Sequence, residues 1–175
     1  MNYQVLVQMR RSIRSYAEQE VSREDLEKIL DISRQAPSWK NGQSARMYVA
    51  YTPEMIEKVA EALPEFNQRS SKNAALVVTT FVKGVSGFGA GEPANEGGDL
   101  WGAYDLGLHD AYLILAATDL GYDSLIMGIR DEKKLREAFS IGVEEQVMSV
   151  IAIGRRKGEA TGKPRKELSE VAVFA

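Results

Sequence analysis

Apolar residues recur at helical spacing in five segments of the chain. Ser22 precedes the second segment as an N-cap with an acidic residue three positions on, and Thr52 with Pro53 opens the third. The fourth segment is apolar nearly all round and is followed by Gly121 as a C-terminal cap, so it belongs in the core. The predicted helices cover about residues 3–10, 22–35, 53–64, 100–120 and a stretch that starts after Asp131.

Four shorter runs have the composition of strands. Residues 74–82 form an uninterrupted β-branched and apolar run, which is typical of a strand buried on both faces. The other predicted strands are residues 47–51, 124–127 and 147–153. No internal repeat and no linker divides the chain, so the pattern predicts one α+β domain over residues 1–175.

Two segments are predicted to be irregular. Residues 37–43 read as a polar loop, because Pro37 ends the preceding helix. Residues 84–98 are rich in glycine and acidic groups, and they predict a long mobile loop of the kind that often forms a lid. Gly89, Gly91 and Ala94 have the spacing of a dinucleotide-binding turn, but no helix is predicted to begin there, so this interpretation is rejected.

The composition of the chain excludes several classes of binding partner and catalytic site. The 175 residues are 44% hydrophobic and 27% charged, as in an ordinary globular domain, and the net charge of -3 argues against a nucleic-acid partner. The absence of cysteine excludes disulfides, thiolate metal sites and cysteine nucleophiles. No apolar run is long enough to span a membrane and no export signal is recognised, so a cytoplasmic protein is expected.

The single histidine offers little for catalysis. Asp105, His109 and Asp110 could place a carboxylate and an imidazole one turn apart, but further metal ligands are missing. The pattern therefore favours a solvated helix face and no metal site. A Ser-His-Asp hydrolase is also excluded, since no serine sits in a nucleophile turn.

Two basic clusters lie at opposite ends of the chain. Arg10, Arg11, Ser12 and Arg14 combine three guanidinium groups and a hydroxyl, a set suited to binding a phosphate. The second cluster consists of Arg155, Arg156, Lys157, Lys163, Arg165 and Lys166. Either cluster alone is typical of a solvated segment, but both in one acidic protein favour a shared anionic ligand.

Several blocks of the sequence closely resemble the FMN-dependent nitroreductase family. The first are Arg10-Arg11-Ser12-Ile13-Arg14-Ser15-Tyr16 and Ala36-Pro37-Ser38-Trp39-Lys40-Asn41-Gly42-Gln43. The later blocks are Asp105-Leu106-Gly107, Leu120-Gly121-Tyr122-Asp123-Ser124, Met127-Gly128, Ile153-Gly154 and Gly162-Lys163-Pro164-Arg165. The resemblance covers nearly the whole chain in order.

The resemblance implies a central mixed β-sheet flanked by helices in an interlocked homodimer, with FMN at the subunit interface. Arg10, Ser12, Lys163 and Arg165 would hold the phosphate, and Arg14 would lie at the pyrimidine end of the flavin, where a cation tunes its potential. The loop of residues 37–43 would come from the partner subunit. The full set of expected cofactor-binding residues is Arg10, Arg11, Ser12, Arg14, Pro37, Ser38, Asn41, Gln43, Leu125, Ile126, Met127, Gly128, Lys163 and Arg165, with a backbone N–H of residues 125–128 directed toward flavin N5.

The implied activity is transfer of a hydride from NAD(P)H to FMN and then to a nitroaromatic or quinone-like acceptor, by ping-pong turnover and without a catalytic side chain. Three alternatives remain open: an FMN storage or sensing module, a specialised relative such as a flavin dehalogenase, and a basic-tailed domain that binds an acidic partner without flavin. Ser44-Ala45 replaces the Pro-Trp that is common in the family, so a large aromatic group is missing and the wall at this position is expected to be looser. Residues 84–98 match no family motif, so the resemblance does not define the substrate-facing lid.

Overall fold

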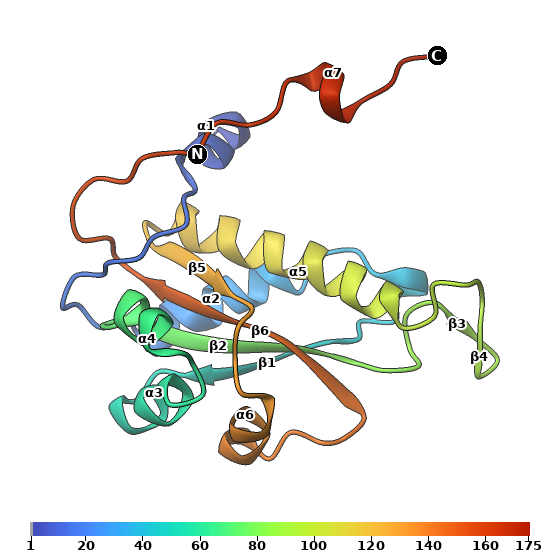
Figure 1. The fold of residues 1–175 in the computed structure, drawn as a ribbon, viewed down its shortest axis with the longest axis horizontal. Coiled ribbons are helices and arrows are strands. Elements are labelled where there is room, and N and C mark those ends of the chain that lie inside the picture. The colour runs from blue at the N-terminus through green and yellow to red at the C-terminus, as the bar shows by residue number, and fades with distance from the viewer. Residues whose placement is uncertain (1) are drawn as a thin grey trace.

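The computed structural model describes residues 2–175 and is built on one four-stranded sheet (Figure 1). Its order is β1 (Ala45–Ala50), β2 (Ala75–Val82), β6 (Glu145–Gly154) and β5 (Asp123–Met127), and each neighbouring pair is antiparallel. An isolated parallel bridge joins Ser12 to Ser124. The α+β prediction is confirmed, and within the described residues the sheet is mixed only through this bridge.

Helices cover both faces of the sheet, which explains why its strands are apolar without alternation. On one face, Leu76 and Val78 of β2 pack in a core with residues of α3 (Pro53–Ala60) and α6 (Glu132–Phe139). On the other, Val77 of β2 and Ile151 of β6 pack with α2 (Arg23–Ser33) and α5 (Leu100–Asp119). Successive residues of a strand therefore pack into two different cores, one on each face of the sheet.

The helix starts agree with the sequence prediction. The side chains of Ser22, Thr52 and Asp131 each accept a hydrogen bond from a backbone N–H in the first turn of α2, α3 and α6. The third helix ends at Ala60, earlier than predicted, and α4 (Glu65–Ser71) starts directly after Pro64. The prediction that Pro64 ends a helix is therefore wrong, because this proline opens the next one.

The long helix α5 lies against the sheet along most of its length (Figure 1). Gly102 allows its first turns to approach β2, since a Cβ there would lie 2.3 Å from the ring of Phe81. The helix ends before Gly121, whose φ of +79° is readily adopted by glycine. The predicted core helix and its cap are thus present.

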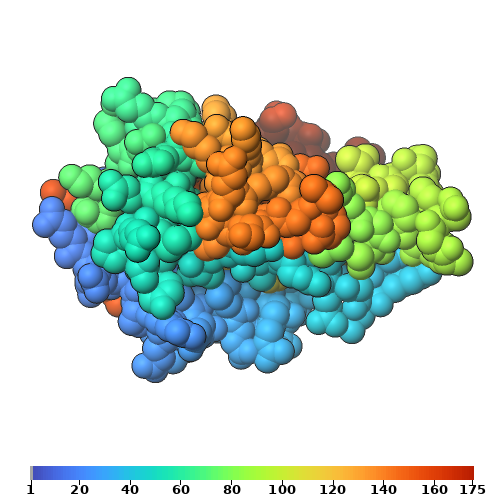
Figure 2. Space-filling model, turned by 90° about the horizontal axis from the view of Figure 1, so that it is seen from below, coloured from blue at the N-terminus to red at the C-terminus, as the bar shows by residue number. Residues whose placement is uncertain are grey.

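Residues 84–98 contain a short hairpin rather than an irregular loop. It is formed by β3 (Phe88–Gly89) and β4 (Glu92–Pro93). The side-chain oxygen of Asn95 accepts hydrogen bonds from the indole N–H of Trp101 and the backbone N–H of Gly97. The hairpin forms one end of the molecule, beside the segment around residue 40 (Figures 1 and 2). The sequence prediction missed this hairpin because its strands are only two residues long.

Both ends of the described chain lie outside the two cores. Helix α1 (Tyr3–Met9) contains no buried residue, and the segment after Gly154 leads through α7 (Leu168–Val171) to an end remote from the sheet (Figure 1). Tyr3, Val173 and Phe174 are 70%, 93% and 85% exposed. Within residues 2–175, no helix has both the length and the apolar character needed to cross a membrane.

Candidate functional site

The two basic clusters of the sequence meet in the structure. Burial lowers the pKa of Arg10, and the nearby positive charges of Arg165 and Arg11 lower it further. The C-terminal segment also passes against Arg11, because a Cβ at Gly162 would lie 2.8 Å from Nε of Arg11. None of these three arginines forms a salt bridge within residues 2–175. We call Arg10, Arg11 and Arg165 the arginine cluster.

Ser12 and Lys163, predicted for the phosphate, and Arg14, predicted for the pyrimidine end, lie on the same two segments as this cluster. Ser12 is exposed and lies beside β5, where the backbone N–H of the next residue, Ile13, donates to the carbonyl of Ser124 (3.0 Å). Arg14 is exposed and its guanidinium approaches the carbonyl of Ser12 (3.4 Å). Lys163 is exposed on the same C-terminal segment as Arg165. These positions leave their polar side chains free to meet an anion.

The segment Leu125–Gly128 belongs to an edge of the sheet. Beyond the bridge at Ser124, β5 in the described chain pairs with β6 on one side only, so alternate backbone N–H groups point away from the sheet. Leu125 and Met127 are buried, whereas Ile126 is 47% exposed. A Cβ built at Gly128 would meet no atom within 4 Å. The edge therefore offers both backbone donors and open space to a planar ligand.

The loop of residues 37–43 contains a 3₁₀ turn, η1 (Trp39–Asn41), and three residues with left-handed backbone. Lys40, Asn41 and Gln43 have φ angles of 48°, 57° and 49°. Such angles are unfavourable for lysine and glutamine, and they persist only where surrounding contacts enforce them. Within the loop, the backbone N–H of Gln43 donates to the hydroxyl of Ser38 (3.0 Å). Pro37 and Asn41 are exposed beside it.

The loop and the arginine cluster lie toward opposite ends of α5 (Figure 1). The backbone N–H of Trp39 bonds to Asp105 in the first half of this helix, whereas Arg11 shares a cavity of about 700 Å³ with Thr118 and Gly121 at its end. A helix rises about 1.5 Å per residue, so Asp105 and Asp119 are about 21 Å apart along its axis. One chain therefore does not bring the two groups together.

The prediction of a solvated face around His109 is wrong. Asp105, His109 and Asp110 are only 5%, 6% and 8% exposed, because α5 is covered by the sheet and by the loop. Oδ2 of Asp105 accepts from the backbone N–H of Trp39 (2.8 Å), and Asp110 accepts from the hydroxyl of Thr79 (3.3 Å). Burial raises the pKa of Asp110. The sequence signal for this burial was the helix itself, which is apolar nearly all round.

His109 itself faces a small cavity. The cavity has a volume of about 140 Å³ and is also lined by Asp105 and by Pro37, Ser38 and Gln43 of the loop. Nδ1 of His109 lies 3.9 Å from Oδ1 of Asp110, too far for a hydrogen bond. Among residues 2–175 no group of three or more potential metal ligands was found.

Two cations of the C-terminal segment have internal partners. Arg156 forms a salt bridge with buried Asp123, with Nη2–Oδ1 and Nε–Oδ2 distances of 2.5 and 2.9 Å. Arg155 lies over the ring of Tyr122, 4.5 Å from its centroid, and donates to the carbonyl of Gly121 (3.0 Å). Within the second basic cluster, Arg155 and Arg156 therefore have partners in the fold, whereas Arg165 lies near Arg10.

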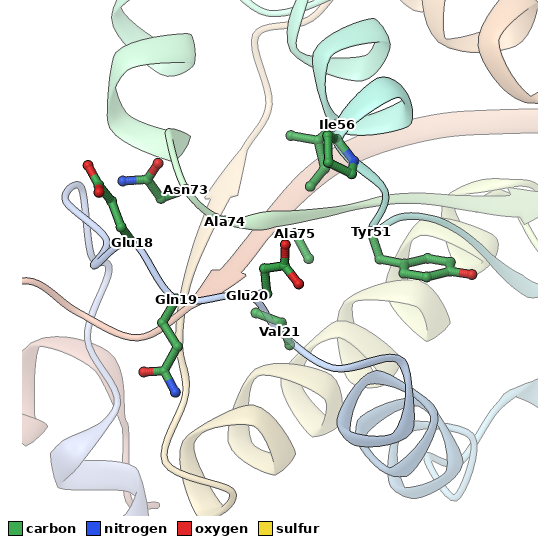
Figure 3. A pocket seen from close by; sticks show the side chains of 10 residues that line it. Glu18, Gln19, Glu20, Val21, Tyr51, Ile56, Asn73, Ala74 and Ala75 are labelled. Atoms are coloured by element: carbon green, nitrogen blue, oxygen red, sulfur yellow. The ribbon is translucent and has the colours of Figure 1, made fainter.

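A separate cavity of about 300 Å³ contains none of the predicted site residues. It is lined by side chains from three parts of the chain, including Glu18, Glu20 and Tyr51 (Figure 3). Its charged side chains are acidic, which is unsuited to an anionic ligand. This cavity lies outside the candidate site.

The family model of the nitroreductase family matches residues 7–155. The chain belongs to the nitroreductase family. The resemblance read from the sequence motifs is thereby confirmed. The match starts before the arginine cluster and includes the loop, α5 and β5, so most elements of the candidate site lie within the family region.

Similar proteins support this assignment. A protein of Archaeoglobus fulgidus named as an NADH dehydrogenase/NAD(P)H nitroreductase is 34% identical over 88% of this chain and 85% of its own length. A nitroreductase family protein from Clostridium difficile has a structure with a TM-score of 0.82 at 25% identity, covering 99% and 98% of the two chains. A nitroreductase from Exiguobacterium sibiricum, solved in complex with FMN, has a TM-score of 0.83 at 22% identity over 100% and 98%.

Proposed function

We propose that this nitroreductase-family chain is an NAD(P)H-dependent FMN oxidoreductase that reduces a nitroaromatic or quinone-like acceptor by ping-pong turnover. The observation that carries the proposal is the arginine cluster: Arg165 and Arg11 lie near enough to Arg10 to lower its pKa, the C-terminal segment passes Arg11 at Gly162, and no salt bridge within residues 2–175 pairs the three with a carboxylate. Like charges repel, so an anion bound among these groups would relieve their repulsion. A phosphate dianion matches both its charge and its forked donors.

The other expected residues fit the rest of an FMN molecule. The edge of β5 presents backbone N–H groups that can orient the isoalloxazine ring at N5, with Gly128 leaving room for it. Arg14 supplies a cation for the pyrimidine end. When bound, FMN supplies the two-electron chemistry, so the chain itself needs to bind, orient and tune the cofactor rather than donate a catalytic acid or base.

The proposed site is shared by two copies of the chain. The separation of the loop from the arginine cluster along α5 supports a partner loop at each flavin. An apolar groove of about 620 Å³ between α1, α2 and α5, lined in part by Tyr3, Ile32 and Tyr112, offers a surface for the second copy. The exposed apolar C-terminal arm supports an interlocked dimer in which it lies on the partner. One FMN-binding domain over residues 1–175 and a cytoplasmic location remain predictions.

The decisive experiment is an absorbance spectrum of the purified protein, recorded under nitrogen before and after addition of NADPH and then NADH. Flavin bands that bleach with either donor would support the reductase. Flavin bands that stay unchanged would contradict it and favour an FMN store or a specialised relative. A protein that stays colourless after incubation with FMN would favour the acidic-partner alternative.

Light scattering tests the shared site separately. The flavin-loaded protein is expected at twice the chain mass of 19.4 kDa. A flavin-loaded particle with the mass of one chain would contradict the interfacial site, because a single loop and cluster would then suffice.

A further inference from the structure

Asp105 joins the 37–43 loop to helix α5. Its carboxylate is 5% exposed, projects from the long helix α5, and accepts the backbone N–H of Trp39 at 2.8 Å. A hydrogen bond to an ionised acceptor is stronger than a neutral one, particularly where water is excluded. The two partners are far apart in sequence, so this bond fixes the loop relative to the fold rather than within itself.

The loop needs such an anchor for two reasons. Its backbone is held in the left-handed region at Lys40, Asn41 and Gln43, a conformation that relaxes unless it is enforced. In addition, the loop covers the cavity of about 140 Å³ that Asp105 and His109 line, so this side of it does not rest on a filled core. Trp39 also packs on Trp101 of α5, with ring centroids 4.7 Å apart.

We infer that Asp105 is a positioning residue for the flavin loop: it holds Trp39 so that the neighbouring Ser38 and Asn41 are preorganised to contact the FMN of the partner subunit. This inference rests on the proposed function for the role of the loop. Asp105 does not touch the flavin. It acts by keeping the loop in a conformation that would otherwise have to be ordered each time FMN binds.

Asp110 provides a matched control. It lies on the same helix, is 8% exposed, and has the same carboxyl group, but it bonds to Thr79 of the sheet rather than to the loop. Asp105→Asn and Asp110→Asn therefore make the same chemical change in similarly buried positions. Only the first is expected to loosen the loop.

The chain contains its own reporter for this test. Its two tryptophans are Trp39 and Trp101, and both belong to the contact between the loop and α5. Tryptophan emission and its quenching by acrylamide can therefore be measured in the flavin-free protein. For Asp105→Asn we expect red-shifted emission and stronger quenching than in wild type, and for Asp110→Asn we expect wild-type values.

The second readout is FMN affinity, measured by quenching of flavin fluorescence on titration with flavin-free protein. Asp105→Asn is expected to weaken binding about tenfold, the equivalent of replacing a charged acceptor by a neutral one, while Asp110→Asn stays within about twofold of wild type. If Asp105→Asn does not fold, Asp105→Glu displaces the oxygen while keeping the charge, and the same two losses are expected.

Three results would overturn the inference. Unchanged tryptophan emission would show that the loop is seated without Asp105. Changed emission with wild-type FMN affinity would show that the loop is no part of the flavin site. The same losses in Asp110→Asn would assign them to α5 in general. If wild type itself binds no FMN, the proposed function fails and the flavin role of Asp105 with it, whereas the fluorescence comparison still tests the anchor.

Discussion

The arginine cluster and the pair Arg155–Arg156 are neighbours in the structure with opposite surroundings. The positive charges of Arg165 and Arg11 lower the pKa of Arg10, and no salt bridge within the described chain pairs any of the three with a carboxylate. Arg156 is bound to buried Asp123, and Arg155 lies on Tyr122. The comparison teaches that the number of cations in a segment does not reveal their use. Cations satisfied by the fold stabilise it, whereas cations crowded together leave their charge for a ligand.

Charge reversal gives the largest expected effect on this comparison. Arg10→Glu should weaken FMN binding about 100-fold, because a charge-assisted contact becomes a repulsion in a partly buried place. Arg165→Glu should have a similar effect. Arg155→Glu should change the affinity less than about threefold, since its guanidinium already has partners in the fold. Titration of flavin-free protein with FMN measures all three, and equal losses would show that the phosphate assignment is wrong.

Neutral substitutions should change the free energy of unfolding differently in the arginine cluster and in the pair Arg155–Arg156. Arg156→Gln should lower the free energy of unfolding by about 2 kcal/mol, because it leaves the buried Asp123 carboxylate without its cation. Arg10→Gln should leave it unchanged or raise it by about 0.3 kcal/mol, because a repulsion is relieved. Urea unfolding of flavin-free protein at one protein concentration measures both. A large loss for Arg10→Gln would mean that Arg10 is a structural cation.

Salt should have a moderate effect on FMN affinity, and this effect should depend on the arginine cluster and not on Arg155. FMN affinity of wild type should fall severalfold between low and high sodium chloride, because ions screen the attraction between the cluster and the phosphate. Arg10→Gln should bind FMN more weakly and with a smaller salt dependence. Arg155→Gln, the matched control, should keep the wild-type dependence. If the FMN affinity of all three proteins changed equally with salt, the arginine cluster would not be the group that binds the FMN phosphate.

Tyr48 of β1 serves as a control residue that belongs neither to the arginine cluster nor to the pair Arg155–Arg156. Burial, together with its hydrogen bond to Glu145 (2.7 Å), raises the pKa of Tyr48 from 10.0 to about 12. Because the folded pKa is the higher one, this stabilisation is complete below pH 10 and is lost as the pH rises toward 12. Tyr48→Phe should therefore show a slightly shallower loss of stability across this window, with unchanged FMN affinity. A steeper loss would contradict the assignment.

Much of the fold followed from local signals. Ser22, Thr52 and Asp131 marked helix starts because an N-cap is satisfied by its own first turn. The apolar run that became β2 was correctly read as buried on both faces. Helix α4 was missed because Pro64 is compatible with either ending one helix or starting another, and only the packing of the following turn decides between them.

The candidate site was less accessible from sequence, because its contacts are distant along the chain. The family motifs named the right segments, but the proximity of Arg10 and Arg165 depends on how the C-terminal segment returns past α1. The role of Asp105 depends on a bond to Trp39 that no local pattern encodes. His109 and Asp110 were misread for a similar reason, since the sheet strand that covers them begins far away in the sequence.

The order of strands in the sheet has a consequence for how the chain folds during synthesis. β2 pairs with β1, made shortly before it, and with β6, in which Ile153 is the partner of Ala75. During synthesis, the edge of β2 that will pair with β6 therefore stays unpaired until the hairpin, α5, β5, α6 and β6 have been made. Pairings between distant segments form slowly, and an open apolar edge can join another chain. Substitutions that weaken β6 are thus expected to reduce the yield of native protein before they affect its chemistry.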